Sequence, residues 1–345
     1  MPEVILSGLH LPGGSAHPPT GADSCAMLRD PLPMLNPLLT RTENNNIVHS
    51  PDAFRRALAR LPAPVPVAPR AVFMVMPEAF HLDEESAVDN HYMHLECKPD
   101  PDRALAEARA LVRLIESVGV PVTCFPGRAD QPDGIFPNNV FGTVPGRFIV
   151  GRMFHHGRQA EAGRRDIRAH FADRVLIDLS GRDLVAELTG AMVIDRGRKM
   201  GFCGMSTRVD DAGMRAMHDA FDLALTYRFD LSPDEYHTNV VLSVLAGRAC
   251  ILPPPSAVDP RVSDAIADAY PGRTLFLDDD EKNAFAGNCI ALTETDLFMS
   301  QTGADALRPS SRAALSDWGF TLHTAEMDEI EKAGGSLRCM LAEIF

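Results

Sequence analysis

Short apolar runs and helical stripes alternate along the chain from Arg70 onward. The run at 71–76 is closed by Pro77, which predicts a buried strand. In residues 101–118 apolar side chains recur at helical spacing up to Gly119, which predicts a helix. The same signals predict further strands at 120–125, 147–151, 174–179, 191–195, 199–203, 238–245, 248–252, 274–278, 288–292, 296–300 and 320–323. They predict further helices at 157–171, 211–225, 259–269 and 309–317. This alternation predicts an α/β fold built from repeated units.

Residues 1–69 have a different composition from the rest of the chain. They hold twelve of the 27 prolines, which remove backbone donors and fix φ, so an extended, polyproline-like arm is predicted. A short helix is expected at 51–60, because Ser50 can cap it and Pro51 fits its first turn. We therefore expect a proline-rich N-terminal extension over residues 1–69 and a folded domain over residues 70–345.

The charge balance and the cysteines narrow the class of protein. Lysine and arginine number 33 against 47 acidic residues, a net charge of −14, which argues against nucleic acid or an anionic membrane as a partner. The sequence shows no signal peptide and no apolar run of about 20 residues. Seven cysteines, an odd number, do not make a disulfide framework. A cytoplasmic protein is expected, and a homo-oligomer is left open.

Cofactor and metal motifs find little support in the sequence. No Gly-x-Gly-x-x-Gly follows a predicted strand and no Walker-type Gly-Lys-Ser/Thr occurs, so no nucleotide cofactor is expected. One group of residues could be assembled into a metal site, namely His81, Asp83, His91, His94 and Glu96. This group lacks the His-Glu-x-x-His spacing of a zinc-binding helix. We interpret His155 and His156 as a solvated turn, and residues 278–282 as a solvated loop.

Polar groups interrupt the pattern beside several predicted strands. Asn138 and Asn139 enter a strand after the run 133–137, where a Pro-Asn turn with side-chain capping is the alternative. Glu187 precedes the strand at 191–195, a position at which a single carboxylate is commonly a solvated loop residue. His237 and Asn239 open the run at 240–245, and strand alternation places them on one face. A structural histidine is the alternative there.

Cys339 lies six residues from the last residue of the sequence, after consecutive glycines at 334 and 335. Such glycines permit a tight turn or a close backbone approach just ahead of the thiol. An inert, buried thiol is the ordinary alternative for one cysteine. A thiol, an imidazole, a carboxylate and buried amides are together the parts of a cysteine-nucleophile site.

Five motifs carry a resemblance to a known family. They are Phe-Pro-Asn-Asn at 136–139, Glu-x-Thr-Gly at 187–190, His-Thr-Asn at 237–239, Phe-Ala-Gly-Asn at 285–288 and Gly-Gly-Ser-x-Arg-Cys at 334–339. In this order they resemble the guanidino-group-modifying (pentein) superfamily, and most of all its arginine-deiminase-related branch of citrulline-utilising hydrolases and arginine dihydrolases. The resemblance covers residues 70–345 and implies a pentein catalytic domain. It implies a five-bladed, pseudo-symmetric α/β propeller of ββαβ-type units.

The resemblance also implies roles for individual residues and no cofactor. Cys339 would be the nucleophile, His237 the general acid and base, and Glu187 the carboxylate that holds the amidine nitrogens of the substrate. Arg158 and Arg208 occupy positions that resemble those gripping the α-carboxylate of the substrate. The remaining substrate-binding candidates are Asp133, Asn138, Asn139 and Asn239. The implied partner is a small guanidino or ureido amino acid.

Two amides and one leucine depart from the pattern of arginine deiminases. Where those enzymes resemble this chain, aspartates stand at the positions of Asn139 and Asn239. An amide can pair with an N–H or a C=O, whereas two aspartates would leave a ureido oxygen unpaired at a cost of about 1–3 kcal/mol. This favours hydrolysis of citrulline, or of arginine through citrulline, to ornithine, ammonia and CO₂. Leu188 stands where relatives usually have glycine, so it is expected to narrow the pocket or shift Glu187.

Three alternatives remain at this point. An amidinotransferase would use the same thiol, imidazole and carboxylate but pass the amidino group to an amine. A dimethylarginine or arginine deiminase-type hydrolase would stop after one hydrolysis. A non-catalytic pentein binding module should not retain Cys339, His237 and Glu187 together.

Overall fold

The computed structural model describes residues 46–93 and 95–345, so His94 and most of the proline-rich arm lie outside the described residues. The described chain has a mixed α/β fold, as the alternation of apolar runs predicts. None of the helices in residues 46–93 and 95–345 is both long and apolar enough to cross a membrane.

Five small sheets repeat one strand pattern. In each sheet the first two strands are antiparallel, and the third strand pairs with the second in parallel after a helical crossover. The first two sheets comprise β16 (Ala342–Ile344), β2 (Ala71–Val75) and β3 (Val122–Phe125), then β4 (Phe141–Val144), β5 (Arg147–Val150) and β6 (Val175–Asp178). The third comprises β7 (Met192–Asp195), β8 (Met200–Met205) and β9 (Leu225–Asp230), with β1 (Ile47–Val48) added parallel to β9. The last two comprise β10 (Ser243–Leu245), β11 (Ala249–Leu252) and β12 (Thr274–Phe276), then β13 (Ile290–Ala291), β14 (Asp296–Ser300) and β15 (Thr321–Ala325).

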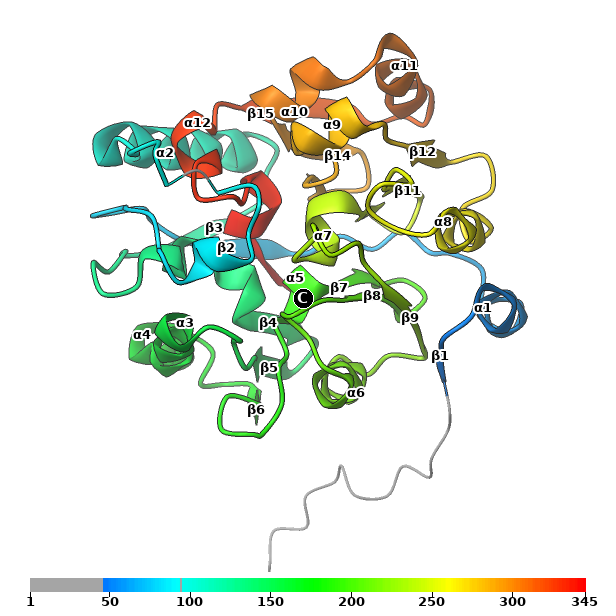
Figure 1. The fold of residues 1–345 in the computed structure, drawn as a ribbon, viewed down its shortest axis with the longest axis horizontal. Helices are drawn as coiled ribbons and strands as arrows, with labels where there is room; N and C mark the ends of the chain where they lie inside the picture. The colour runs from blue at the N-terminus through cyan, green and yellow to red at the C-terminus, as the bar shows by residue number, and fades with distance from the viewer. Residues whose placement is uncertain (1–45, 94) are drawn as a thin grey trace, which may run out of the picture. The chain divides into compact units, whose positions relative to one another are not determined.

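The crossover helices lie outside the sheets, which surround the centre of the molecule (Figure 1). They are α2 (Pro101–Ser117), the short α3 (His156–Gln159) with α4 (Arg165–His170), α6 (Asp211–Ala220), α8 (Pro260–Ala267), and α10 (Gln301–Ala306) with α11 (Pro309–Asp317). Three further α-helices are α1 (Pro51–Leu58), α9 (Asp279–Asn283) and α12 (Asp328–Glu331). β16, from the C-terminal end of the sequence, is the first strand of the sheet that contains β2, so chain segments far apart in sequence complete one sheet.

A single helical turn precedes the first strand of four sheets, and these turns hold, or directly follow, six of the candidate site residues: Asn138, Asn139, Glu187, His237, Asn239 and Cys339. They are η3 (Pro137–Asn139) before β4, α5 (Leu188–Ala191) before β7, α7 (Thr238–Val241) before β10 and η5 (Leu337–Met340) before β16. In the fifth unit, turn residues ending at Asn288 precede β13. The prediction of a strand over 238–245 is therefore wrong in its first half, because residues 238–241 form a helical turn that His237 precedes.

The segment before Arg70 packs on the folded domain where it is described. The predicted helix is confirmed as α1, whose Ser50 side chain accepts a hydrogen bond from the backbone N–H of Ala53 at 3.3 Å. Phe54 of α1 is fully buried and stacks on Tyr227 with ring centroids 4.6 Å apart. Further along, the backbone N–H of Val67 donates to the carbonyl of Ala246.

Three other local predictions are corrected. Residues 278–282 are not a solvated loop, because Asp278 and Glu281 form a reciprocal capping box that begins α9, and Glu281 is fully buried. The helix expected at 211–225 ends at Ala220, and β9 begins at Leu225. The stretch 157–171 is broken into short helical pieces rather than one helix.

Candidate active site

The thiol of Cys339 is buried at the end of the turn η5 and is held by amides. The Asn288 side chain donates from Nδ2 to Sγ at 3.2 Å, and Sγ lies 3.9 Å from Asn239 Oδ1. Asn288 Oδ1 also accepts the backbone N–H of Arg338, so this amide fixes the turn and the sulfur together. Burial raises the pKa of the Cys339 thiol, and the Asn288 hydrogen bond opposes this rise. A cation placed beside the sulfur would favour the thiolate.

His237 and Glu187 form a buried pair. His237 Nε2 lies 2.8 Å from Glu187 Oε2, and both residues are at most 1% exposed. Burial lowers the pKa of His237 below its ordinary value, although Glu187 opposes this effect. Burial alone would raise the pKa of Glu187, but the Arg208 charge and the His237 hydrogen bond bring it to about 2. An ionised carboxylate therefore orients a neutral imidazole, whose proton on Nε2 leaves the Nδ1 lone pair available.

The partners of Glu187 change the role implied by the resemblance. Oε1 accepts the backbone N–H of Phe154 at 3.0 Å, while Oε2 accepts from His237 and, at 3.4 Å, from Arg208. A carboxylate offers about four acceptor positions, so these three bonds leave about one for a substrate N–H. In this geometry the Glu187 carboxylate orients the His237 ring and has little capacity left for a substrate.

Close backbone packing brings the Asn139 amide next to the imidazole. A β-carbon at Gly190 would lie 2.5 Å from Asn139 Oδ1 and 2.8 Å from the His237 ring, so only glycine fits between them. Thr189 anchors the neighbouring turn by donating to the Asn138 carbonyl at 3.0 Å. Gly334 has a φ of +69°, and a β-carbon there would collide with the Asn90 side chain. The tight turn predicted ahead of Cys339 is therefore confirmed.

The two arginines expected to grip a carboxylate already hold carboxylates of the chain. Arg158 forms a fork with Glu161, at 2.9 and 3.0 Å, and donates to the backbone carbonyl of Asp133 at 3.1 Å. Arg208 forms a second fork with Asp89, at 2.9 and 2.6 Å. The structure thus shows Arg158 and Arg208 as parts of buried ion pairs, and any contact with a substrate would add to these pairs.

Asp89 was not identified from the sequence. Its carboxylate also accepts from Thr207, and it lies 2.9 Å from Nε2 of His155. Burial alone would raise the pKa of Asp89, but the Arg208 fork holds it well below its ordinary value. His155 is 7% exposed, so its interpretation as part of a solvated turn is wrong. No motif marks these two residues, because their contacts join segments 66 positions apart.

Cys339, Asp133, Asn139, Arg158 and Arg208 line one cavity of about 270 Å³. Glu187 and His237 are not among its lining residues. Burial raises the pKa of Asp133, although the nearby Arg158 charge opposes this. Within the described chain, Asp133 Oδ1 has no hydrogen-bond partner, so a cationic ligand would relieve the cost of ionising this carboxyl.

Several buried amide atoms near the thiol also lack partners among the described residues. They are both side-chain atoms of Asn138, Oδ1 of Asn139 and Nδ2 of Asn239. Nδ1 of His237 is likewise without a partner there. Buried polar atoms are seldom left unpaired in folded proteins, so this cluster is typical of a site that a polar ligand completes.

Leu188 does not narrow this cavity. It is fully buried in a core cluster with Ala186 and Ala191, and a β-carbon at Gly151 would lie 2.9 Å from its Cγ. Metal binding finds no support in the described residues, where no group of three His, Cys, Asp or Glu side chains could hold an ion. His91 instead lies 3.9 Å from Asp234.

Comparisons with known proteins identify the family. The profile of the eukaryotic N,N-dimethylarginine dimethylhydrolase family matches residues 76–345, more than three quarters of the chain. No curated protein matches the sequence. The substrate-bound N-terminal domain of ArgZ, an arginine dihydrolase from the ornithine-ammonia cycle in Cyanobacteria, has a TM-score of 0.70 at 19% identity and covers 79% of this chain and 97% of its own.

Two further structures share the fold. Unliganded AgrE has a TM-score of 0.71 at 18% identity, over 80% of this chain and 39% of that chain. A dimethylarginine dimethylaminohydrolase adduct with S-methyl-L-thiocitrulline has a TM-score of 0.63 at 17% identity, over 80% of this chain and all of that chain. At these identities the likeness concerns the fold, and the profile match establishes the relationship. The chain belongs to the N,N-dimethylarginine dimethylhydrolase family, within the guanidino-modifying pentein superfamily.

Proposed function

We propose that this protein is a cysteine-dependent hydrolase that converts citrulline, or arginine through citrulline, to ornithine, ammonia and CO₂. The observation that carries the proposal is the pair of unpartnered amide atoms near the thiol, the acceptor Asn139 Oδ1 and the donor Asn239 Nδ2. A ureido group presents N–H donors and one C=O acceptor, so it complements one acceptor and one donor. The five sheets of one strand pattern support the five-bladed propeller that this assignment implies.

The chemistry follows from the buried groups. His237 takes the proton of the Cys339 thiol as Sγ attacks the ureido carbon. The bond from that carbon to the ornithine nitrogen then breaks, and His237 passes this proton to the departing amine. An S-carbamoyl group remains on Cys339. His237 then takes a proton from water, which attacks the carbonyl carbon and returns the electron pair to sulfur. With arginine, a first round releases ammonia and gives citrulline.

The hydrogen bond between His237 and Glu187 supports these proton transfers. The neutral imidazole needs a carboxylate beside it to stabilise the imidazolium that forms after water is deprotonated. Glu187 is ionised, fully buried and in contact with the ring, which meets this need. Asp133, with its unpartnered oxygen, is placed to receive the ammonium of the amino acid.

Supplying arginine and citrulline separately to the full chain tests the proposal. Ornithine from citrulline is expected, with one ammonia and one CO₂ for each ornithine. Ornithine from neither compound would refute it. Citrulline accumulating from arginine without ornithine would indicate simple deimination instead.

Family membership favours one second candidate, the hydrolysis of dimethylarginine to citrulline and dimethylamine. A dimethylamine assay separates this reaction from the proposed one, because neither citrulline nor arginine can release that amine. Adding glycine as an acceptor in the same assay would expose amidino transfer.

A further inference from the structure

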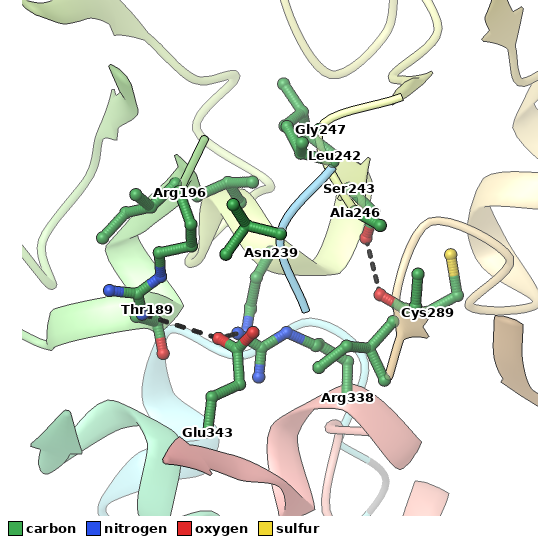
Figure 2. Close-up of a pocket in the computed structure, with 16 residues that line it drawn as sticks. Thr189, Arg196, Asn239, Leu242, Ser243, Ala246, Gly247, Cys289, Arg338 and Glu343 are labelled. Carbon is green, nitrogen blue, oxygen red and sulfur yellow. Dashed lines mark hydrogen bonds and ion pairs between the residues drawn. The ribbon is translucent and has the colours of Figure 1, made fainter. Parts of the chain in front are cut away.

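A second cavity, of about 510 Å³ with its mouth, is lined in part by Asn239 (Figure 2). Asn239 lines this cavity, and its Oδ1 lies 3.9 Å from the sulfur of Cys339. Arg338, the residue before the nucleophile, lines it too. The second cavity therefore lies next to the active-site cavity, although the two have no lining residue in common.

Positive charge exceeds negative charge in this cavity. Figure 2 shows the guanidinium groups of Arg196 and Arg338 converging on the carboxylate of Glu343. Oε2 of Glu343 lies 3.6 Å from Arg196 and 3.0 Å from Arg338, so one carboxylate serves two cations. The three side chains are between 10% and 14% exposed. A buried cation without a full counter-charge is costly, and a small anion would remove that cost.

Arg196 is held rigidly but keeps donors to spare. Its guanidinium lies over the rings of Phe345, at 4.3 Å, and Phe221, at 5.2 Å, and Nη1 donates to the Thr143 carbonyl. The described contacts use two of the five N–H groups of this side chain. Burial lowers the pKa of Arg196, and the neighbouring Arg338 charge adds to this effect while Glu343 opposes it. A fixed fork of N–H donors is the geometry that binds carboxylate-like anions.

Arg196 also connects the cavity to the surface. It lines an outer depression together with Arg147, Lys199 and Asp222, where Lys199 donates to the Asp222 carboxylate at 2.7 Å. Val67, from the proline-rich stretch, lines both spaces. A β-carbon at Gly197 would lie 2.1 Å from the Val65 carbonyl oxygen, which shows how closely this stretch is seated. The stretch thereby gives the second cavity part of its wall.

We propose that the Arg196–Arg338 cavity binds a small carboxylate-class anion and is the route by which the anionic fragment leaves Cys339. This assignment of the route rests on the proposed function. Hydrolysis of the S-carbamoyl group breaks the S–C bond with the electron pair going to sulfur, and the carbamic acid formed loses a proton to give carbamate. Carbamate, like bicarbonate, is a small planar anion, whereas ornithine carries a cationic side chain that the arginines would repel.

Formate and bicarbonate are suitable probes, and binding to the full chain can be followed by calorimetry at constant ionic strength. We expect formate to bind, and Arg196→Gln to weaken its affinity at least about tenfold. Arg196→Lys should recover only part of the affinity, because it keeps the charge and loses the fork. Arg261→Gln, at an arginine that is 83% exposed, is the matched control and should bind formate like the parent.

The results separate the two proposals. Absence of formate binding by the parent up to about 100 mM, or equal binding by parent and Arg196→Gln, would overturn the anion site. Bicarbonate inhibition that is noncompetitive with citrulline, and that Arg196→Gln removes, supports the exit route. Failure to form ornithine would refute the proposed function, whereas the formate titration needs no turnover and decides the anion site by itself.

Discussion

The active-site cavity and the Arg196–Arg338 cavity have opposite charge balance. In the active site, two guanidiniums pair with four acidic side chains, namely Asp89, Asp133, Glu161 and Glu187, although burial raises the pKa of Asp133 and raises that of Glu161 to about 7. In the Arg196–Arg338 cavity, two guanidiniums share only Glu343. One side therefore suits an ammonium or guanidinium, and the other suits an anion. A reaction that takes in a cationic amino acid and releases carbamate would use both sides.

The largest effect should come from the sulfur of Cys339, which lines the active-site cavity. We expect Cys339→Ala to lower turnover by at least about 10⁴-fold, because no covalent intermediate can form. The substitution removes one atom, so the near-ultraviolet circular dichroism and the unfolding midpoint should change little. Cys203→Ala is a suitable control, since that thiol is also fully buried but belongs to a core cluster. Equal activity of parent and Cys339→Ala would contradict the nucleophile assignment.

Glu187→Gln should weaken both turnover and stability. The folded protein holds the pKa of Glu187 at about 2 against an ordinary value of 4.5. The group therefore contributes stability that is full above pH 4.5 and is lost as the pH falls toward 2, by about 3 kcal/mol. Urea unfolding of parent and variant at pH 7, 4.5 and 3 measures this contribution. The free energy of unfolding should fall less steeply with decreasing pH in the variant than in the parent.

Glu294→Gln is the control for that measurement, because Glu294 is exposed. It should follow the parent at every pH. If the free energy of unfolding of Glu187→Gln is below that of the parent by the same amount at pH 3 as at pH 7, the depressed pKa of Glu187 is not the cause of the stability difference.

Asn139→Asp tests whether the amide sets the preference between uncharged and charged substrates. A carboxylate at this position adds negative charge and removes an amide, so it favours a guanidinium over a ureido group. We expect the ratio of kcat/KM for arginine to kcat/KM for citrulline to rise by about 5- to 150-fold, equivalent to about 1–3 kcal/mol. Asn283→Asp, on α9, should leave the ratio unchanged. A constant ratio in Asn139→Asp would refute the amide argument.

Most strands and longer helices could be predicted from the sequence because their apolar spacing is regular. The one-turn helices before the strands could not, since four residues show no helical period. Tertiary contacts determine the conformation of residues 238–241, because Thr238 donates to the Ala191 carbonyl and accepts from the Gly204 N–H. The same hydrogen bonds place His237 at the start of its turn rather than on a strand face.

The candidate site divides in a similar way. Three of the five motifs bring Cys339, Asn239 and Asn288 into contact, because each motif fixes a local turn whose position the repeated fold then supplies. Asp89 and His155 carry no local signature, and only the folded chain places them against Arg208. Charge surplus in a cavity is also invisible in sequence, since Arg196 and Arg338 are 142 positions apart and meet at Glu343.

Leu188→Ala should have the smallest effect on the substrate ratio, although it lowers stability. The side chain is fully buried against Gly142 and Gly151 in the core and lines neither of the two cavities. Removing it should reduce the free energy of unfolding by about 2–4 kcal/mol, as for other buried leucines. The preference between arginine and citrulline should stay within about twofold, because the backbone bonds from Gly190 and Ala191 to the Glu187 carbonyl remain. A changed preference in a variant that still folds would mean that Leu188 positions Glu187, and the charge contrast between the two cavities would then depend on core packing as well.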